Sequence, residues 1–519
     1  MERAQKIAII GLTLLLYTVT NYGGIRGPDE EVMFRAGESL LDRGNLTIAP
    51  DLGPLAGFGV ARGRDGQLYS IFGPLQSILC APLIGLGRRI AATGWYEGRE
   101  DIVPASFYVG DGLMEYLQQT TPSHPYEDAV RFVVSFYNVV VCAAIVGVFW
   151  SVCARLTPSR TGVLLSATLL ALGTPLWPYA GKFNSDPTAL LFVLIAADQL
   201  LRLDPRLRPA AGEARGAAWR GLVAGVSLGL GTAAHISACL FVPFFAGYCL
   251  YNGWRSRAGR RSVAAFASGC GVVLILLGYY NLVRFGSVFE TGRTVSLTDV
   301  QRFGYGYFVL PWRGLYGLLL SPGKGLLLYS PAVVLGLLCW RHLQAKAPAL
   351  SLTLSGAVAF RLLFMASRSD WHGGFCLGPR YLLMMIPFMI LPVALWVEAA
   401  VRERRWWRLV LCSLAVLLCI SQQLYFSLGE VSSYYHAVKF AVLSHHQTAL
   451  FGDGVYMIWS VAPLGHLLAW RRGPFLLQGL PLSNQALWLA GTLIVCAALV
   501  PLIVYSARCE RGEGRKQPS

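Results

Sequence analysis

Long runs of apolar residues, separated by short polar segments, dominate the chain. The clearest runs cover residues 7–22, 132–154, 263–282, 381–397 and 487–505. These lengths approach or exceed the roughly 20 residues that cross the hydrocarbon core of a bilayer as a helix. The pattern predicts membrane-spanning helices, because a segment in lipid must satisfy its backbone hydrogen bonds internally.

Basic residues gather in the short segments between the apolar runs. Seven segments that we predict to be cytoplasmic hold 21 Lys or Arg and only four carboxylates, whereas residues 23–127 hold 13 carboxylates and eight Arg. Positive charge marks cytoplasmic loops, so we expect the first outer loop, 23–127, to lie on the other side. The net charge of +16 then reflects orientation in the membrane, and we expect no nucleic-acid partner.

Alternating the two sides predicts an all-α polytopic membrane protein with about 13 transmembrane helices. Segment 72–90 is apolar enough to cross, but Gly73 and Pro82 interrupt it and a crossing there would invert the charge pattern. We therefore expect it to lie flat as a juxtamembrane helix, beside a short amphipathic helix over 31–43. Only 14% of the residues are charged, against about 25% in soluble domains. We expect one integral-membrane domain over residues 1–519.

Acidic residues stand at two predicted membrane boundaries. Asp29 and Glu30 follow the first helix in the stretch GPDEE, and Asp186 opens a later helix in KFNSDP. Acids at helix starts favour the helix dipole and can cap the first turn, which is one interpretation. The other is a general base at the lip of a cavity. The predicted topology puts both acids at the same face, which favours a shared site.

A glycine-rich outer loop, WHGGFCLGPRY, leads into the apolar run at 381–397. Its glycines allow close approach of the backbone to a ligand. Arg380 follows at the edge of the helix, where a phosphate is a plausible anionic partner and snorkelling to the interface is the alternative. Further residues considered for substrate contacts are Lys182, His235, Tyr69, Trp371 and His372.

Cofactor chemistry has little support in the sequence. No pair of His or Cys residues has the spacing of a metal site, so no cofactor is predicted with certainty. Asp29 and Glu30 could hold a divalent metal ion together with a substrate phosphate. Lys324 lies in SPGKG, which lacks the Walker spacing, so nucleotide binding is rejected there.

Six segments carry a resemblance to a known family. The first three are GPDEEVMFRAGESLLDRGNLTI, GRDGQLYSIFGPLQSILCAPLIGLG and KFNSDPTALLFVLIA, and the others are YNLVRFGSVFETGR, LLLSPGKGLLLYSPAVVLGL and DWHGGFCLGPRYLLMMIPF. In this order they resemble the GT-C membrane glycosyltransferases, in the branch of the lipid A aminoarabinose transferase and the protein O-mannosyltransferases. The resemblance covers residues 1–400 as a catalytic module and leaves 400–519 as variable C-terminal helices.

The resemblance implies a function and three catalytic residues. Asp29 matches the family's first-loop catalytic Asp, Glu30 its acidic neighbour and Asp186 its second-loop Asp. The implied enzyme is an inverting hexosyl- or pentosyltransferase that moves a sugar from a polyprenyl-phosphate carrier to a hydroxyl of a lipid, glycan or protein acceptor. A polytopic transporter or a flippase of lipid-linked sugars is the alternative, although we find no paired halves of the kind that transporters show.

One departure from the family concerns the carrier phosphate. Related sequences place a Lys implicated in phosphate binding near Ile71 or Phe72, and this chain has none there. We expect Arg380, Lys182 or His235 to replace it. The excess of Arg over Lys is typical of a GC-rich bacterium, so we expect an inner (plasma) membrane location with the site facing the periplasm or exterior.

Overall fold

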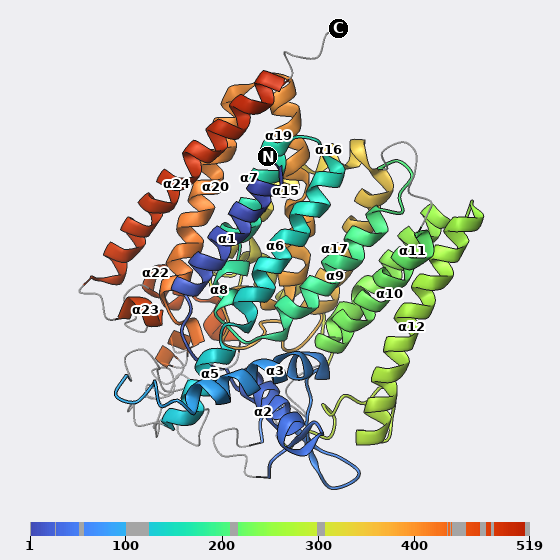
Figure 1. Cartoon of the computed structure of the whole chain (residues 1–519), viewed down its shortest axis with the longest axis vertical. Helices are drawn as coiled ribbons and strands as arrows, with labels where there is room; N and C mark the ends of the chain where they lie inside the picture. Colours follow the sequence, from blue (N-terminus) through green and yellow to red (C-terminus); the bar gives the residue numbers. More distant parts are fainter. Residues whose placement is uncertain are drawn as a thin grey trace.

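The structure is a computed structural model of the chain. It describes all residues except 1, 26, 51–56, 100–123, 208–215, 298–306, 433, 436, 439–452, 468–473, 479–481 and 514–519. Most of the described residues are helical (Figure 1), as the apolar pattern predicts. Part of the first outer loop, 23–127, therefore lies outside the described residues.

Long helices run side by side as a bundle along the tall axis of Figure 1. They are α1 (Glu2–Val19), α6 (Tyr137–Leu156), α7 (Arg160–Leu172), α9 (Ser185–Leu201), α10 (Ala217–Ala234), α11 (Val242–Gly253), α12 (Arg257–Phe285), α17 (Pro348–Ala366), α19 (Pro392–Arg402), α20 (Trp406–Leu428) and α24 (Asn484–Glu513). Shorter helices connect them: α8 (Leu176–Ala180), α13 (Trp312–Leu320), α14 (Leu326–Tyr329), α15 (Ala332–Leu338), α16 (Trp340–Lys346), α18 (Ile386–Ile390), α22 (Pro463–His466) and α23 (Phe475–Gln478). Four are 3-10 turns: η2 (Ile236–Phe241), η4 (Arg380–Met385), η6 (Gly454–Met457) and η7 (Trp459–Val461).

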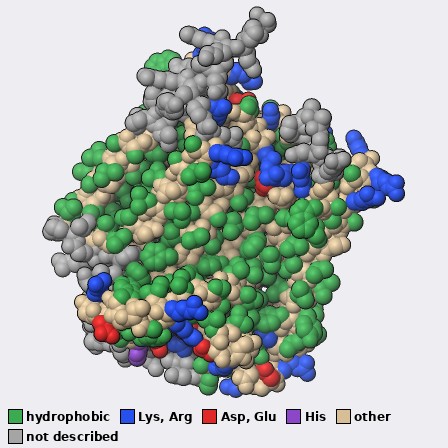
Figure 2. Space-filling view, in the orientation of Figure 1, with side chains coloured by type: hydrophobic (Ala, Val, Ile, Leu, Met, Phe, Trp, Pro, Cys, Tyr) green, Lys and Arg blue, Asp and Glu red, His purple; other side chains and the backbone are tan. Residues whose placement is uncertain are grey.

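Six helical segments among the described residues are long and apolar enough to cross a membrane. They are Pro125–Leu156, Ile236–Gly253, Arg257–Phe285, Pro348–Ala366, Arg380–Arg402 and Trp406–Leu428. Figure 2 shows a hydrophobic middle with charged side chains toward both ends, as expected for a multi-pass membrane protein. The predicted number of about 13 spans stays a prediction, because several other helices fall below these limits of length or apolarity.

The first outer loop forms a cover across one end of the bundle. It contains α2 (Pro28–Arg43), α3 (Pro74–Ala91) and a small antiparallel sheet in the order β1-β3-β2, and α5 (Pro125–Val134) connects it to α6 of the bundle. Its strands are β1 (Thr47–Ile48), β2 (Val60–Arg62) and β3 (Leu68–Ser70). Figure 1 shows α2 and α3 lying obliquely across the lower ends of the upright helices. The two juxtamembrane helices predicted for this loop are confirmed as helices.

A buried ion pair joins this cover to the bundle. Glu31 of α2 accepts hydrogen bonds from Arg131 (2.6 Å) and from Arg35 (2.9 Å). Glu31 and Arg131 are each only 3% exposed in their side chains. Because α5 leads directly into the apolar span of α6, this contact fixes the start of α2 relative to the membrane helices.

Glycines let α10 and α12 approach closely. Gly221, Gly225 and Gly229 recur every fourth residue along α10, and a Cβ atom at each would meet α12 at 2.2, 2.1 and 2.6 Å. Small residues at this spacing are typical of tightly packed membrane helices. The close packing of α10 against α12 places His235, at the end of α10, at the lower side of the bundle beside α2 and α3.

Candidate active site

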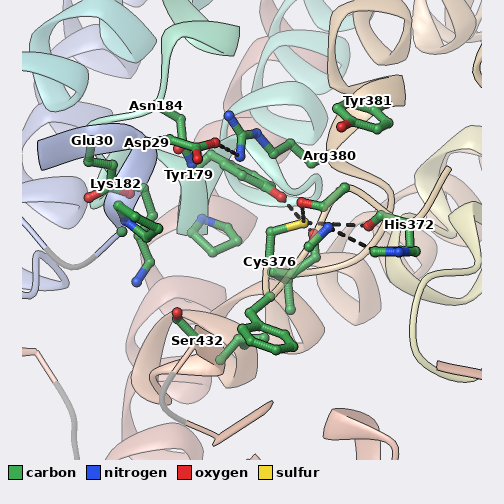
Figure 3. Close-up of a pocket in the computed structure, with 18 of the residues that line it drawn as sticks. Asp29, Glu30, Tyr179, Lys182, Asn184, His372, Cys376, Arg380, Tyr381 and Ser432 are labelled. Atoms are coloured by element: carbon green, nitrogen blue, oxygen red, sulfur yellow. Dashed lines mark hydrogen bonds and ion pairs between the residues drawn. The ribbon is translucent and has the colours of Figure 1, made fainter. Parts of the chain in front are cut away.

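A cavity of about 300 Å³ lies between the cover and the lower ends of the bundle helices. Its walls come from the start of α2, the turn between α8 and α9, the break between α10 and η2, and the loops near residues 293, 370–381 and 426–432. Asp29, Glu30, Lys182, His235, His372 and Arg380 all line it. Figure 3 shows most of these side chains converging from different helices.

Arg380 connects the two acidic motifs. Its Nη1 donates to Oδ2 of Asp29 and its Nε donates to Oδ2 of Asp186, both at 2.8 Å. Asp29 and Arg380 line the cavity, whereas the fully buried Asp186 reaches the site only through Arg380. The chemical roles of the three side chains stay predictions. One guanidinium faces two carboxylates, so the trio carries a net negative charge when all three groups are ionised.

Exposure distinguishes the two carboxylates. The side chain of Asp186 is 0% exposed, whereas that of Asp29 is 22% exposed toward the cavity. A buried charge is tolerated only when it is paired, and Arg380 provides the pair for Asp186. Capping is not the role of Asp186, because the N-cap position of α9 is Asn184, which itself makes no side-chain cap hydrogen bond. Asp29 lies in the first turn of α2, behind Pro28.

Glycines and a buried lysine determine the conformation of the loop before Arg380. Gly378 has a φ of +53°, a left-handed conformation that glycine adopts without a Cβ penalty. Lys324, fully buried, donates from Nζ to the carbonyl oxygens of Gly374 (2.7 Å) and Cys376 (2.6 Å). The lysine of SPGKG thus holds the glycine-rich loop in place and does not enter a nucleotide site.

His235 lies beside Asp186 at the junction of α10 and η2. Its Nε2 is 3.8 Å from Oδ1 of Asp186, and its Nδ1 contacts the Ser237 hydroxyl at 2.7 Å. Burial lowers the pKa of His235 to about 4, although the nearby Asp186 carboxylate acts in the opposite direction. His235 is therefore a neutral side chain at pH 7 and supplies no positive charge for a phosphate.

Lys182 and His372 line the cavity but are already engaged. Lys182 forms an ion pair with the buried carboxylate of Glu430, and its Nζ lies 4.7 Å from the centre of the Tyr22 ring. The His372 ring stacks on Tyr456 at 4.8 Å, and its Nδ1 accepts a hydrogen bond from a backbone N–H of its own loop. An anionic ligand would have to compete with Glu430 for Lys182.

Two residues considered for substrate contacts lie outside this cavity. Tyr69 is on β3, where side chains alternate between faces, so its ring points away from the buried Leu68 and Ser70; its hydroxyl donates to Asp65 (2.7 Å). Trp371 is only 2% exposed and donates from Nε1 to Asp453 (3.2 Å). Neither ring is among the residues that line the cavity, and a role of either in substrate binding stays a prediction.

Arg293 is a cavity residue that the sequence reasoning did not single out. It lines the cavity, and within the described chain it has no carboxylate or hydrogen-bond partner. Gly292 just before it has a φ of +97°, and a Cβ there would meet the Phe285 ring at 2.8 Å. The turn after α12 therefore requires glycine at 292. The available signal was the family-like segment YNLVRFGSVFETGR, which ends at Arg293.

A metal site has no complete ligand set among the described residues. No group of three His, Cys, Asp or Glu side chains there is close enough to hold an ion. Asp29 and Asp186 both bind the Arg380 guanidinium, which occupies the position where a cation would neutralise them. We therefore derive no step through a metal ion.

Comparison with known proteins found similarity in structure alone. No protein-family model and no curated protein sequence matches the chain. Among solved structures it is similar to ArnT from Cupriavidus metallidurans bound to undecaprenyl phosphate, with 14% identity, 89% of this chain and 76% of that chain covered, and a TM-score of 0.44. It is also similar to the Archaeoglobus fulgidus oligosaccharyltransferase in complex with zinc and sulfate, with 12% identity, 88% and 57% covered, and a TM-score of 0.49. Both solved proteins are GT-C fold glycosyltransferases, the class that the sequence motifs resemble.

Proposed function

We propose that this protein transfers a sugar from a polyprenyl-phosphate carrier to an acceptor hydroxyl, with inversion at the anomeric carbon. The observation that carries the proposal is a cavity at the end of a membrane bundle that is lined by Asp29, Arg293 and Arg380, with the buried Asp186 paired to Arg380 behind it. Asp29 then offers a base for the acceptor hydroxyl, and Arg293 offers a cation for the leaving phosphate. The buried Asp186 supplies the counter-charge of Arg380.

Asp29 is the residue that fits the role of general base. One oxygen, Oδ2, accepts from Arg380, and the partly exposed carboxylate has no other partner in the described part of the chain. In the proposed step Asp29 removes the hydroxyl proton of the acceptor as its oxygen attacks the anomeric carbon. The bond between that carbon and the carrier phosphate breaks on the opposite face, which inverts the configuration.

The leaving phosphate gains negative charge, so it needs a cation and not a proton. Arg293 forms no ion pair or hydrogen bond in the described structure, although its charge acts on the nearby Asp370 carboxylate. Its planar fork of donors suits phosphate oxygens. Arg380 can also contact the phosphate, because its Nη2 has no hydrogen bond in the described structure. This assignment changes the expected phosphate partner from Arg380, with Lys182 or His235, to Arg293 assisted by Arg380.

The orientation of the site belongs to the same proposal. The cover over the cavity is built from the acidic first outer loop, and the basic connections lie toward the other end of the bundle. The positive-inside rule then supports a site on the non-cytoplasmic face of the inner membrane. There it would meet a carrier lipid from the bilayer and an acceptor from outside the cell.

The test uses purified protein in proteoliposomes with a panel of undecaprenyl-phosphate carriers bearing radiolabelled hexoses or pentoses. Lipid, glycan and peptide hydroxyl acceptors are supplied in turn. We expect one carrier to release free undecaprenyl phosphate and to label an acceptor, and the Asp29→Asn protein to do neither. Movement of intact carrier across the bilayer, with no release of undecaprenyl phosphate, would instead identify the flippase alternative.

A further inference from the structure

Arg361 is a charged residue deep inside an apolar helix. It lies on α17, its side chain is 0% exposed, and within the described chain it has no direct carboxylate partner. Its guanidinium donates to three groups instead: the carbonyl oxygen of Ser237 (2.8 Å), the hydroxyl of Ser237 (3.0 Å) and the carbonyl oxygen of Tyr381 (2.9 Å). Ionisable residues buried in membrane helices are costly and are commonly functional.

These contacts join the two turns that carry site residues. Ser237 lies in η2, two residues after His235, and Tyr381 lies in η4, directly after Arg380. Arg361 therefore fixes the backbone behind both His235 and Arg380 from a third helix. Both turns are 3-10 helices of six residues, whose hydrogen-bond geometry is poorer than that of an α-helix, so the contacts of Arg361 add to the bonds that hold them.

The hydrogen-bond directions determine where His235 carries its proton. Arg361 can only donate, so the Ser237 oxygen accepts from it and the hydroxyl hydrogen is left for Nδ1 of His235, at 2.7 Å. The backbone N–H of Ser237 also donates to Nδ1, at 3.3 Å. With two donors directed at it, Nδ1 bears no hydrogen, and the neutral ring must carry its hydrogen on Nε2.

That hydrogen faces an oxygen that lacks a partner. Oδ1 of Asp186 is buried and has no hydrogen bond, while the other oxygen, Oδ2, binds Arg380. Nε2 of His235 lies 3.8 Å from this Oδ1, which is longer than a hydrogen bond but within the range of an electrostatic contact. A buried unsatisfied oxygen is unfavourable, and the N–H of His235 places a polar hydrogen beside it.

We propose that Arg361 and Ser237 are positioning residues that hold His235 as the Nε2–H tautomer, so that this N–H supports Asp186 and keeps Arg380 directed at Asp29. The role in transfer rests on the proposed function, whereas the tautomer does not. The chain of contacts runs from α17 through η2 and α9 to η4 and α2, so a change at Arg361 or Ser237 should reach Asp29 without touching a substrate.

The first experiment measures the tautomer directly. Protein labelled with ¹⁵N-histidine is compared with the His235→Gln protein, and the signals lost identify His235 among the eight histidines. We expect a bare Nδ1 and a protonated Nε2 at pH 7. In Ser237→Ala the hydroxyl donor is gone, and we expect a measurable fraction of the ring to become protonated at Nδ1. A protonated Nδ1 in the unmodified protein would overturn the proposal.

The second experiment measures the consequence in the proteoliposome assay. Ser237→Ala should lower turnover about tenfold, as for a lost buried hydrogen bond, with little change in KM for the carrier. His235→Gln retains an N–H near the Nε2 position and should keep most of the activity, whereas His235→Phe should not. Ser166→Ala is the control for truncating a buried serine and should match the unmodified protein, because Ser166 of α7 does not line the cavity and its hydroxyl makes no hydrogen bond in the described structure.

The outcomes separate the two proposals. If His235→Phe is as active as His235→Gln, the N–H has no positioning role and the inference fails. If Ser166→Ala loses as much turnover as Ser237→Ala, the effect is general loosening of the bundle and the inference fails again. If the unmodified protein transfers no sugar from any carrier, the proposed function fails, and the ¹⁵N measurement still decides the tautomer.

Discussion

Single residues at the site differ chiefly in how far water reaches them. Asp186 is fully buried and held by Arg380, whereas Asp29 shares the same guanidinium but opens to the cavity. A carboxylate that must accept a proton from a substrate has to be reachable, so the exposed member of the pair is the better base. The buried member is better suited to fixing the arginine.

Replacing Asp29 by Asn tests the proposed base. We expect transfer to fall by about 100- to 10,000-fold, because that is the usual contribution of a positioned base. Binding of undecaprenyl phosphate and thermal stability should change little, since a first-turn charge contributes only about 0.3–1 kcal/mol. Glu30→Gln is the comparison, as the neighbouring acid is buried at the cavity edge. Activity of Asp29→Asn within a few-fold of the unmodified protein would leave Asp29 as a helix-start acid.

Replacing Arg293 by Ala tests the proposed phosphate cation. We expect affinity for undecaprenyl phosphate to fall at least tenfold, as when a hydrogen bond between charged groups is lost, with an unchanged melting temperature. Arg380→Ala is a poorer test of binding, because it leaves Asp186 buried without its partner at a cost of about 3–5 kcal/mol. Arg62→Ala, at an exposed arginine of β2, is the matched control. Equal affinity of the Arg293→Ala and Arg62→Ala proteins for undecaprenyl phosphate would contradict this role of Arg293 and favour Arg380 as the residue that binds the phosphate.

At the scale of elements, the ion pair between α2 and α5 keeps the cover on the bundle. Burial opposes ionisation of Glu31, but the Arg131 guanidinium and then Arg35 outweigh it and hold the pKa of Glu31 below its usual value. Glu31 lies two residues after Asp29 on the same helix. The ion pair between Glu31 and Arg131 therefore also fixes the position of Asp29 in the wall of the cavity.

Replacing Glu31 by Gln tests this attachment. Removing one member of a buried pair leaves Arg131 unpaired and should cost about 3–5 kcal/mol of stability. Glu127→Gln is a close control, because Glu127 contacts the same arginine at 3.3 Å but is 58% exposed; an exposed pair contributes about 0–1 kcal/mol. Thermal unfolding of both proteins in detergent gives the comparison, and similar losses would contradict the role of burial.

The lowered pKa of Glu31 also predicts how the stability of the folded protein changes with pH. Glu31 is ionised more readily in the folded protein than in the unfolded one, so its contribution is complete above the unfolded pKa of about 4.3 and is lost as pH falls through the lower folded pKa. Unmodified protein should therefore lose stability on acidification below that range. The Glu31→Gln protein should show a smaller acid-induced loss.

At the scale of the whole molecule, the two ends of α12 test the orientation of the site. Ser256 and Ser287 flank this helix and are both exposed. Single cysteines at these positions are treated with a membrane-impermeant maleimide in intact cells, with the native protein as background. We expect Ser287→Cys to be labelled directly and Ser256→Cys only after the cell interior is opened. The reverse result would put Arg293, six residues after Ser287, on the cytoplasmic face.

The elements of the fold followed closely from the apolar pattern. The two helices across the end of the bundle were both predicted: α2 from an amphipathic pattern over 31–43, and α3 because glycines and prolines interrupt the apolar segment 72–90. The number of crossings was not determined in this way, since helices such as α7 and α8 are too short for hydropathy to classify. The break between α10 and η2 was indicated in the sequence only by His235, a histidine between two apolar runs.

The sequence by itself determined the membrane class, and it predicted the side on which the acids gather and the roles of Asp29, Asp186 and Arg380. These depend on hydrophobic length, charge balance and local motifs, all of which are properties of neighbours along the chain. Only the tertiary structure decided that Arg380 bridges the two acids, that Lys182 pairs with Glu430, and that Arg293 lines the cavity whereas Tyr69 and Trp371 do not. Those pairings join residues up to 351 positions apart, and no local pattern records which distant partner a buried charge will find.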